Sequence, residues 1–226
     1  MSLDEKIRLV CFDLGGVLVR IRTQWPDLCR AARLDVRGDS GGDVAERARR
    51  LLSDALQLGS LSPDAWLTEV GTALGGLYTA EEITALHDAV LVEEYAGVGA
   101  LIDDLHRAGV ATACLSNTNA VHWATMLHHD GSAPLPGEPR YPGVKSLRSL
   151  NASHLMRLVK PAPEIYRALE GATGFAGAQI LFFDDLAENV AAARHVGWIA
   201  EQIDPTQPTD VQMRRYLAVH GVISAS

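Results

Sequence analysis

The segment IRLVCFDLGGVLV (residues 7–19) carries the strongest structural signal in the chain. Its apolar residues run almost without interruption to Phe12 and stop at an aspartate that is followed closely by two glycines. This pattern is typical of a strand that is buried on both faces and ends in a turn. We therefore predict a central strand that ends at Asp13, where Gly15 and Gly16 let the backbone pass close to a ligand.

Two later segments resemble the first one. VATACLS (residues 110–116) and QILFFDD (residues 179–185) are apolar, and each ends in a polar residue. Residues 99–108 and 163–171 have the apolar spacing of helices. Strands that alternate with helices predict an α/β fold, with a Rossmann-like parallel sheet and helices on both of its faces.

Polar residues stand at the ends of these three predicted strands. Asp13 follows the first, Ser116 ends the second, and Asp184 and Asp185 end the third. Ligands of such sheets bind beyond the carboxyl ends of the strands. We therefore expect these four residues to converge on one crevice.

Residues 21–96 differ in residue pattern from these segments, with many alanines and leucines at helical spacing. Four helices are expected here, and Thr79 with Glu82 three residues later forms a capping box at the start of the last one. We predict an all-helical cap domain of residues 21–96, inserted into a discontinuous core domain of residues 1–20 and 97–226. Such a cap would lie over the crevice, and its closure would be part of the mechanism.

The composition excludes several classes of protein. Of 226 residues, 47% are apolar, which is enough for a sizeable core and excludes disorder. The net charge is −8 and the basic residues form no dense cluster, so we expect no nucleic-acid partner. The start, MSLDEKIRLV, lacks the apolar run of a signal peptide, and no segment approaches the ~20 apolar residues that span a bilayer. We predict a cytoplasmic protein without a membrane partner, and the sequence leaves its oligomeric state open.

The three cysteines are Cys11, Cys29 and Cys114. They are widely spaced and contain no CxxC pair of the kind that binds zinc or forms a redox motif. Reduced structural thiols are expected.

Four residues are candidates for chemistry on an anionic substrate. Asp13 either acts as a nucleophile or only begins a turn. The hydroxyl and amide groups of Ser116 and Asn117 suit phosphate oxygens, and a plain strand-end turn explains them about as well. Lys160, just before a proline, places its ammonium either in the crevice or at the exposed surface.

Asp184 and Asp185 are adjacent acids, and their like charges cost free energy unless a cation offsets them. Mg²⁺ prefers a few carboxylates together with water and substrate phosphate oxygens, which suits Asp13 and Asp185 as its ligands. An N-cap for the helix that follows would explain one of the two acids but not both.

Four motifs occur in the order and rough spacing of the haloacid dehalogenase (HAD) superfamily, which the chain resembles over nearly its whole length. They are FDLGGVLV (residues 12–19), LSNTN (115–119), the KP of LVKPAPEIY (158–166) and FFDDLAENV (182–190). The chain is most similar to bacterial HAD phosphatases with a small helical (C1-type) cap. These include phosphatases that act on α-glucose 1-phosphate, which also read DLG in the first motif.

The resemblance implies a role for each matching residue of the metal site. Asp13 would attack phosphorus to form an aspartyl-phosphate that water then hydrolyses. The other oxygen of Asp13, the backbone carbonyl of Gly15 and the carboxylate of Asp185 would bind Mg²⁺. Asp184 would lie close to these ligands, and Asn189 would orient the acids.

The resemblance also implies that Ser116 and Asn117 hold the phosphoryl oxygens, while Lys160 neutralises charge on the nucleophile and phosphate. Phosphoryl transfer depends mainly on such positioning and electrostatic stabilisation. The implied function is a Mg²⁺-dependent phosphatase for a small phosphorylated metabolite, with a sugar phosphate among the candidates.

Gly15 departs from the family pattern. Most HAD phosphatases have an aspartate at this position, which serves as general acid for the leaving group and then as base for water. General acid–base help is worth about 10²- to 10⁴-fold in rate, so its loss favours substrates with better leaving groups, such as sugar 1-phosphates, aryl phosphates or acyl phosphates. Asp27 and Asp35 are the nearest acids downstream, and the sequence places neither in the crevice.

Two other functions stay open at this point. A 2-haloacid dehalogenase would use Asp13 to attack carbon without a metal, but such enzymes usually have an aromatic residue at the position of Gly15 and lack the paired acids Asp184 and Asp185. A non-catalytic binding or regulatory protein would keep the fold without turnover. The nucleophile, the lysine and both metal-site acids are all present, which favours the enzyme.

Several further residues have both a functional and a structural interpretation. Arg20 and Arg22 would meet a substrate anion or remain solvated charges. The imidazoles of His122, His128 and His129 lack the spacing of a metal motif. Trp66 and Trp123 would line the substrate pocket or pack in the core.

Overall fold

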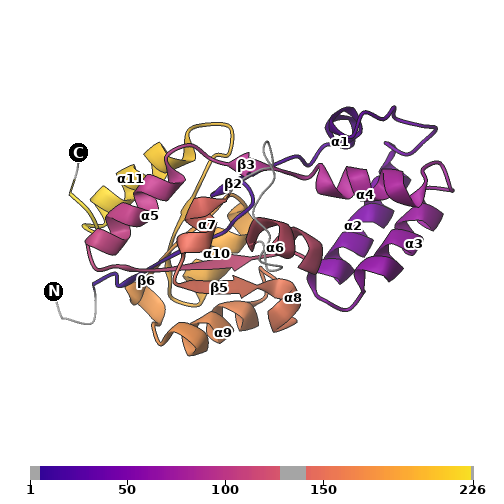
Figure 1. Cartoon of the computed structure of the whole chain (residues 1–226). Helices are drawn as coiled ribbons and strands as arrows, with labels where there is room; N and C mark the ends of the chain where they lie inside the picture. Colours follow the sequence, from indigo (N-terminus) through magenta and orange to yellow (C-terminus); the bar gives the residue numbers. More distant parts are fainter. Residues whose placement is uncertain (1–5, 128–140, 225–226) are drawn as a thin grey trace.

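A computed structural model describes residues 6–127 and 141–224. Its main sheet has five parallel strands in the order β5-β4-β1-β6-β7. The strands are β1 (Leu9–Phe12), β4 (Ala111–Ser116), β5 (Ser149–Ala152), β6 (Ile180–Asp184) and β7 (Ile199–Gln202). The predicted Rossmann-like α/β fold is confirmed, with the first apolar segment as the central strand (Figure 1).

Strand β1 explains why helices cover both faces of the sheet. All four of its residues are buried, and successive side chains point to opposite faces. Val10 and Phe12 belong to one hydrophobic cluster, whereas Leu9 and Cys11 belong to another. A strand that is apolar on both sides requires a helical layer on each side.

The two layers use different helices. The cluster of Val10 and Phe12 takes its helical residues from α5 (Val98–Arg107), α6 (Ala120–Leu127), α7 (Pro142–Ser146) and α11 (Thr209–Val219). The opposite cluster takes them from α9 (Pro163–Thr173) and α10 (Ala187–His195). Two short elements, α8 (Ser153–Met156) and the 3₁₀ helix η2 (Gly177–Gln179), complete the connections. No helix within the described residues is long and apolar enough to cross a bilayer.

Four helices are inserted between β2 (Val19–Ile21) and β3 (Leu91–Glu94), and we call them the inserted helices. They are α1 (Trp25–Ala31), α2 (Asp43–Gln57), α3 (Pro63–Ala73) and α4 (Ala80–Asp88). An antiparallel ribbon of β2 (Val19–Ile21) and β3 (Leu91–Glu94) joins them to the rest of the chain. They have a hydrophobic cluster of their own and lie to one side of the main sheet, on the side away from α11 (Figure 1).

Local side-chain caps mark the starts of two of these helices. Ser62 caps α3 by accepting a hydrogen bond from the backbone N–H of Ala65, and Thr79 with Glu82 forms the expected capping box of α4. The three cysteines are buried free thiols, also as predicted.

Candidate active site

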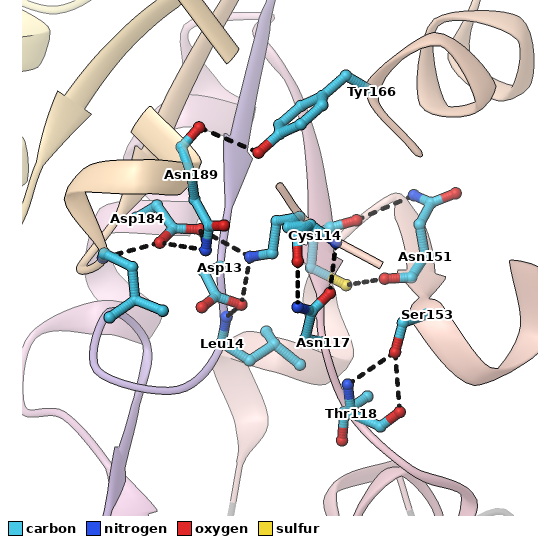
Figure 2. Close-up of polar contacts among 12 residues, drawn as sticks. Asp13, Leu14, Cys114, Asn117, Thr118, Asn151, Ser153, Tyr166, Asp184 and Asn189 are labelled. Atoms are coloured by element: carbon cyan, nitrogen blue, oxygen red, sulfur yellow. Dashed lines mark hydrogen bonds and ion pairs between the residues drawn. The ribbon is translucent and has the colours of Figure 1, made fainter. Parts of the chain in front are cut away.

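The central strands bring the predicted polar residues to one edge of the sheet. Phe12 of β1 is in register with Cys114 of β4 on one side and with Phe183 of β6 on the other. Asp13, directly after β1, therefore lies between the ends of β4 and β6. Figure 2 shows Asp13 beside Asp184, with Asn117 on the neighbouring segment.

Asp13 is held by its backbone and by one carboxylate oxygen. Its N–H donates to Phe183 O (2.8 Å), and its Oδ1 accepts from the backbone N–H of Leu14 (2.7 Å) and from Lys160 Nζ (3.0 Å). Burial raises the pKa of Asp13 to about 6, although Lys160 opposes the shift. The carboxylate is thus oriented before any ligand arrives.

Lys160 is buried, so the alternative of an exposed lysine is wrong. Its Nζ lies 2.7 Å from Asp184 Oδ2, in addition to its contact with Asp13. Burial by itself lowers the pKa of Lys160, but Asp13 and Asp184 outweigh it and hold the pKa above its usual value. The ammonium therefore stays charged between two carboxylates.

The side chain of Asn117 contacts the backbone of Lys160, and its expected contact with phosphoryl oxygens stays a prediction. Its Oδ1 accepts from Lys160 N (2.9 Å) and its Nδ2 donates to Lys160 O (2.9 Å). Both the oxygen and the nitrogen of the side-chain amide are thus hydrogen-bonded to the backbone of Lys160, which leaves the second N–H of Nδ2 for another acceptor. Ser116, which ends β4, is buried at the cavity described below.

The two acids after β6 have different surroundings. Asp184 is fully buried and accepts from Lys160, from the backbone N–H of Leu186 (2.9 Å) and from Asn189 Nδ2 (2.9 and 3.1 Å). Asp185 is only partly buried, and no other described side chain donates to its carboxylate. Burial, together with the carboxylates of Asp13 and Asp184, raises the pKa of Asp185 to about 7.

The donor set of the site fits a divalent cation. Asp13, Asp184 and Asp185 each offer a carboxylate oxygen, and these atoms lie within 4.8 Å of one another. A single ammonium, that of Lys160, contacts two of the three, so negative charge is in excess when all are ionised. Carboxylate oxygens are the ligands that Mg²⁺ prefers. Since Asp184 is already bonded to three partners, Asp13 and Asp185 are the acids available to a cation.

Glycine is required at Gly16, and a side chain at Gly15 would be crowded. Gly16 has φ +75°, and a Cβ there would lie 2.5 Å from Asp185 Oδ2. A Cβ at Gly15 would lie 3.0 Å from Ile21 Cδ1. Ile21 thus occupies part of the space beside the position where the family's general acid would begin.

A cavity of about 550 Å³ lies between this edge of the sheet and the inserted helices. Helix α2 turns a polar face towards it, whereas Val44 and Leu51 on the same helix are 68% and 70% exposed. Three of the polar residues, Glu46, Arg50 and Asp54, are also exposed to solvent, whereas Ala45 and Leu52 pack in the hydrophobic cluster of the inserted helices. The polar face consists of Glu46, Arg49, Arg50, Ser53, Asp54 and Gln57.

The structure separates the paired candidates. Arg22 lines the cavity and donates to Ala89 O (2.9 Å), whereas Arg20 is exposed and pairs with Glu93 (3.7 Å). Trp66 also lines the cavity, whereas Trp123 packs in the core of the main domain.

Asp27 and Asp35 do not line the cavity, and Asp27 pairs with Arg30 on its own helix. The described acids that do line it are Glu46 and Asp54. Sequence reasoning did not select these two, because a charged residue on a helix is usually solvated.

Histidines contribute a second polar cluster at the cavity wall. His122 is buried and stacks on His87, with ring centroids 3.9 Å apart. His87 was missed because nothing in the sequence links two residues on separate helices. His128 and His129 lie outside the described residues.

Comparison with known proteins identifies the family. A family model of haloacid dehalogenase-like hydrolases matches residues 7–197. The chain belongs to this family. A structure described as a predicted HAD-like family hydrolase from Porphyromonas gingivalis is similar at 25% identity and a TM-score of 0.72, over 93% of this chain and 98% of that one.

Two further HAD structures are similar in fold. A HAD family enzyme from Bacteroides thetaiotaomicron, in complex with magnesium and inorganic phosphate, has a TM-score of 0.69 at 20% identity, over 89% of this chain and 96% of that one. The L-2-haloacid dehalogenase from Xanthobacter autotrophicus, with chloropropionic acid covalently bound, has a TM-score of 0.60 at 18% identity, over 97% and 85%. Proteins of this fold have therefore been solved with magnesium and phosphate and with a covalently bound chloropropionic acid.

Proposed function

We propose that this HAD hydrolase is a Mg²⁺-dependent phosphatase for a small phosphorylated metabolite and works through an aspartyl-phosphate at Asp13. The observation that carries the proposal is the cluster of three carboxylates, two buried and one partly buried, of which only two contact the ammonium of Lys160. Such a cluster is unfavourable without a further cation, and a dehalogenase that attacks carbon needs none. The neighbour from Bacteroides thetaiotaomicron, which was solved with magnesium and phosphate, supports the same choice.

The reaction would proceed in two steps. An oxygen of Asp13 forms a bond to phosphorus while the bond from phosphorus to the leaving oxygen breaks, and the leaving oxygen takes a proton from water because Gly15 offers no acid. Water then attacks phosphorus, which releases inorganic phosphate and restores the Asp13 carboxylate. Mg²⁺ held by Asp13, Asp185 and the carbonyl of Gly15 would supply positive charge to the phosphoryl oxygens.

The remaining residues would position the reacting groups. Lys160 keeps its charge beside Asp13 and would stabilise the phosphoryl group. Asn117 would act through Lys160, which it holds by the backbone. Asn189 would orient Asp184, and Ser116 would donate its hydroxyl to a phosphoryl oxygen.

The inserted helices would form a C1-type cap domain, with residues 21–96 as the cap and residues 1–20 and 97–226 as the core. A cavity of about 550 Å³ is large enough for a small sugar phosphate, and the polar face of α2 would meet its hydroxyl groups. Because Gly15 offers no acid, a good leaving group such as that of a sugar 1-phosphate is the most suitable.

The test is release of inorganic phosphate from p-nitrophenyl phosphate and a panel of sugar phosphates, with Mg²⁺ and with EDTA. Asp13→Asn should lower Mg²⁺-dependent turnover by at least about 10³-fold. The matched control is Asp103→Asn, an exposed acid on α5, which should keep full activity. Both variants should have the far-UV circular dichroism spectrum of the wild type.

Two results would contradict the proposal. Release of chloride from 2-chloropropionate that is insensitive to EDTA would favour a dehalogenase. No turnover of any compound by a folded protein that still binds Mg²⁺ would favour a non-catalytic protein.

A further inference from the structure

His87, Asn119 and His122 form a cluster that we call the histidine junction. Asn119 Oδ1 accepts from the backbone N–H groups of Val121 and His122 (both 3.1 Å) and so caps the start of α6. This fixes which end of the amide is which. Its Nδ2 must face the two imidazoles, 3.2 Å from His87 Nε2 and 3.2 Å from His122 Nδ1.

The amide determines the protonation of both rings. An amide nitrogen donates but does not accept, so His87 Nε2 and His122 Nδ1 must both carry a lone pair. The proton of His122 is then on Nε2, which donates to His87 O (3.0 Å). The proton of His87 is on Nδ1, which faces Asp88 Oδ1 at 3.8 Å. The junction therefore accepts two neutral imidazoles of defined tautomer.

The junction connects the inserted helices to the loop beside the candidate active site. His87 lies in the last turn of α4, and its carbonyl oxygen accepts from Val90 N (3.1 Å) as well as from His122 Nε2 of α6. At the end of α2, Ser153 Oγ makes an equivalent contact with Gln57 O (2.6 Å) and also accepts from Thr118 N (3.0 Å). Thr118 and Asn119 directly follow Ser116 and Asn117. Thr118 is thus linked through Ser153 to the end of α2, and Asn119 contacts the end of α4.

The charges around the junction are few. Asp88 faces His87 from its own helix, Trp66 of α3 packs on the His87 ring (4.8 Å), and His154 Nδ1 contacts the neighbouring Thr118 O (3.1 Å). Burial and the neighbouring His87 lower the pKa of His122 to about 4. The other charged residues that line the same cavity are Arg22, Glu46, Arg49, Arg50 and Asp54.

We propose that Asn119 is a positioning residue: by donating to two neutral imidazoles it fixes α4, and with it the cavity wall, against the loop of residues 116–119. For its effect on catalysis this inference depends on the proposed phosphatase function. The junction itself is independent of that function.

Two variants separate this role from simple helix capping. Asn119→Ser and Asn119→Asp both keep an oxygen that caps α6. Serine cannot donate to both rings, so the junction should be weakened at every pH. Aspartate has no amide proton, but it attracts an imidazolium, so protonation of His122 should rebuild the junction as the pH falls.

The kinetic test compares each variant with the wild type on p-nitrophenyl phosphate at each pH, so that titrations common to both cancel. We expect kcat/KM of Asn119→Asp to be about tenfold below wild type at pH 8.5 and within about threefold at pH 6. Asn119→Ser should be about tenfold lower at both. Equal, pH-independent losses in the two variants, or no loss in either, would overturn the proposal.

Nitrogen-15 NMR of the histidine rings tests the junction without any need for turnover. In the wild type, His122 should carry its proton on Nε2 and stay neutral well below pH 6. In Asn119→Asp, His122 should titrate at or above about pH 6.5. If the rings behave as expected while the wild type hydrolyses nothing, the junction stands and the phosphatase function fails. If His122 titrates alike in both proteins, the positioning role fails.

Discussion

The two polar clusters beside the cavity differ in how their polar groups are compensated: the cluster around Asp13 carries excess negative charge, whereas the histidine junction is neutral and hydrogen-bonded. Around Asp13, three carboxylates lie together and one ammonium contacts two of them. The pKa values of Asp13 and Asp185 rise to about 6 and 7 because their charged forms are disfavoured. In the histidine junction each ring nitrogen facing Asn119 accepts a hydrogen bond from its Nδ2, and both rings are neutral. A cluster with unbalanced charge requires a ligand, whereas a satisfied neutral cluster holds the structure together.

The clusters also predict opposite dependence of stability on pH. The folded protein binds more protons than the unfolded chain at Asp13 and Asp185 between about pH 4 and 7, so their contribution falls as the pH rises. At His122 the unfolded chain binds more protons between about pH 4 and 6.5, so its contribution rises with pH. Variants that remove one group at a time should therefore change the pH profile in opposite directions.

The largest effect is expected when the charged cluster loses its ammonium. In Lys160→Met, Asp13 and Asp184 stay buried without their partner, which should lower the free energy of unfolding by about 3–5 kcal/mol at pH 8 and abolish turnover. Urea denaturation without Mg²⁺ measures the loss. Part of it should return near pH 5, where protonation relieves the carboxylates. Lys145→Met, at an exposed lysine of α7, is the control, and an equal loss there would contradict the argument.

The neutral cluster is tested by removing the titration of His122. In the wild type, His122 should lower the free energy of unfolding by up to about 3 kcal/mol as the pH falls from about 6.5 to 4, and have no effect above pH 7. His122→Gln keeps a donor near His87 O but does not titrate. Its free energy of unfolding should therefore fall less steeply below about pH 6.5 than that of the wild type. The control is His106→Gln, at a residue of α5 that is hydrogen-bonded to Thr112 of β4. This variant should leave the fall in the free energy of unfolding below about pH 6.5 unchanged. If the free energy of unfolding of His122→Gln falls with pH as steeply as that of the wild type, the titration belongs to another group.

Asp185→Asn should relieve the charge repulsion within the carboxylate cluster and should also remove the stabilisation of the protein by Mg²⁺. Without Mg²⁺ above pH 7, the variant should be more stable than the wild type by about 1–2 kcal/mol, less than its pKa alone implies because water screens the partly exposed carboxylate. Mg²⁺ at 100 times its Kd should stabilise the wild type by about 2.7 kcal/mol, less so below pH 6, and should not stabilise the variant. Thermal unfolding with Mg²⁺ and with EDTA gives both numbers. Equal Mg²⁺ effects in the two proteins would remove Asp185 from the metal site.

The smallest effect is expected at the cavity wall between the clusters. Arg22→Met should raise KM by about fivefold for a substrate whose leaving group carries a second anion, and much less for p-nitrophenyl phosphate. The reason is that Arg22 faces the cavity with one backbone acceptor and no carboxylate within salt-bridge distance among the described residues. Arg20→Met is the matched control, since Arg20 pairs with Glu93 at the surface. Identical shifts in both variants would indicate a general loss of positive charge.

Much of the fold and part of the site were predictable because their signals are local. The alternation of faces in residues 9–12, the aspartate and glycines that follow, and the capping box of Thr79 and Glu82 each lie within a few neighbouring residues. Short-range sterics and hydrogen bonding govern such features, and they placed Asp13 and Asp184 at adjacent strand ends.

The partners within the site depend on contacts between distant parts of the chain. Asn117 bonds to Lys160 across 43 residues, and His122 bonds to His87 across 35. No local pattern encodes which helix packs against which loop. The sequence therefore left Lys160 open to an exposed position and did not pair His122 with His87. Packing brought Lys160 between two carboxylates and placed polar residues of α2 along the cavity. Lys160 and its carboxylates must pair with one another because burial removes water as their alternative partner.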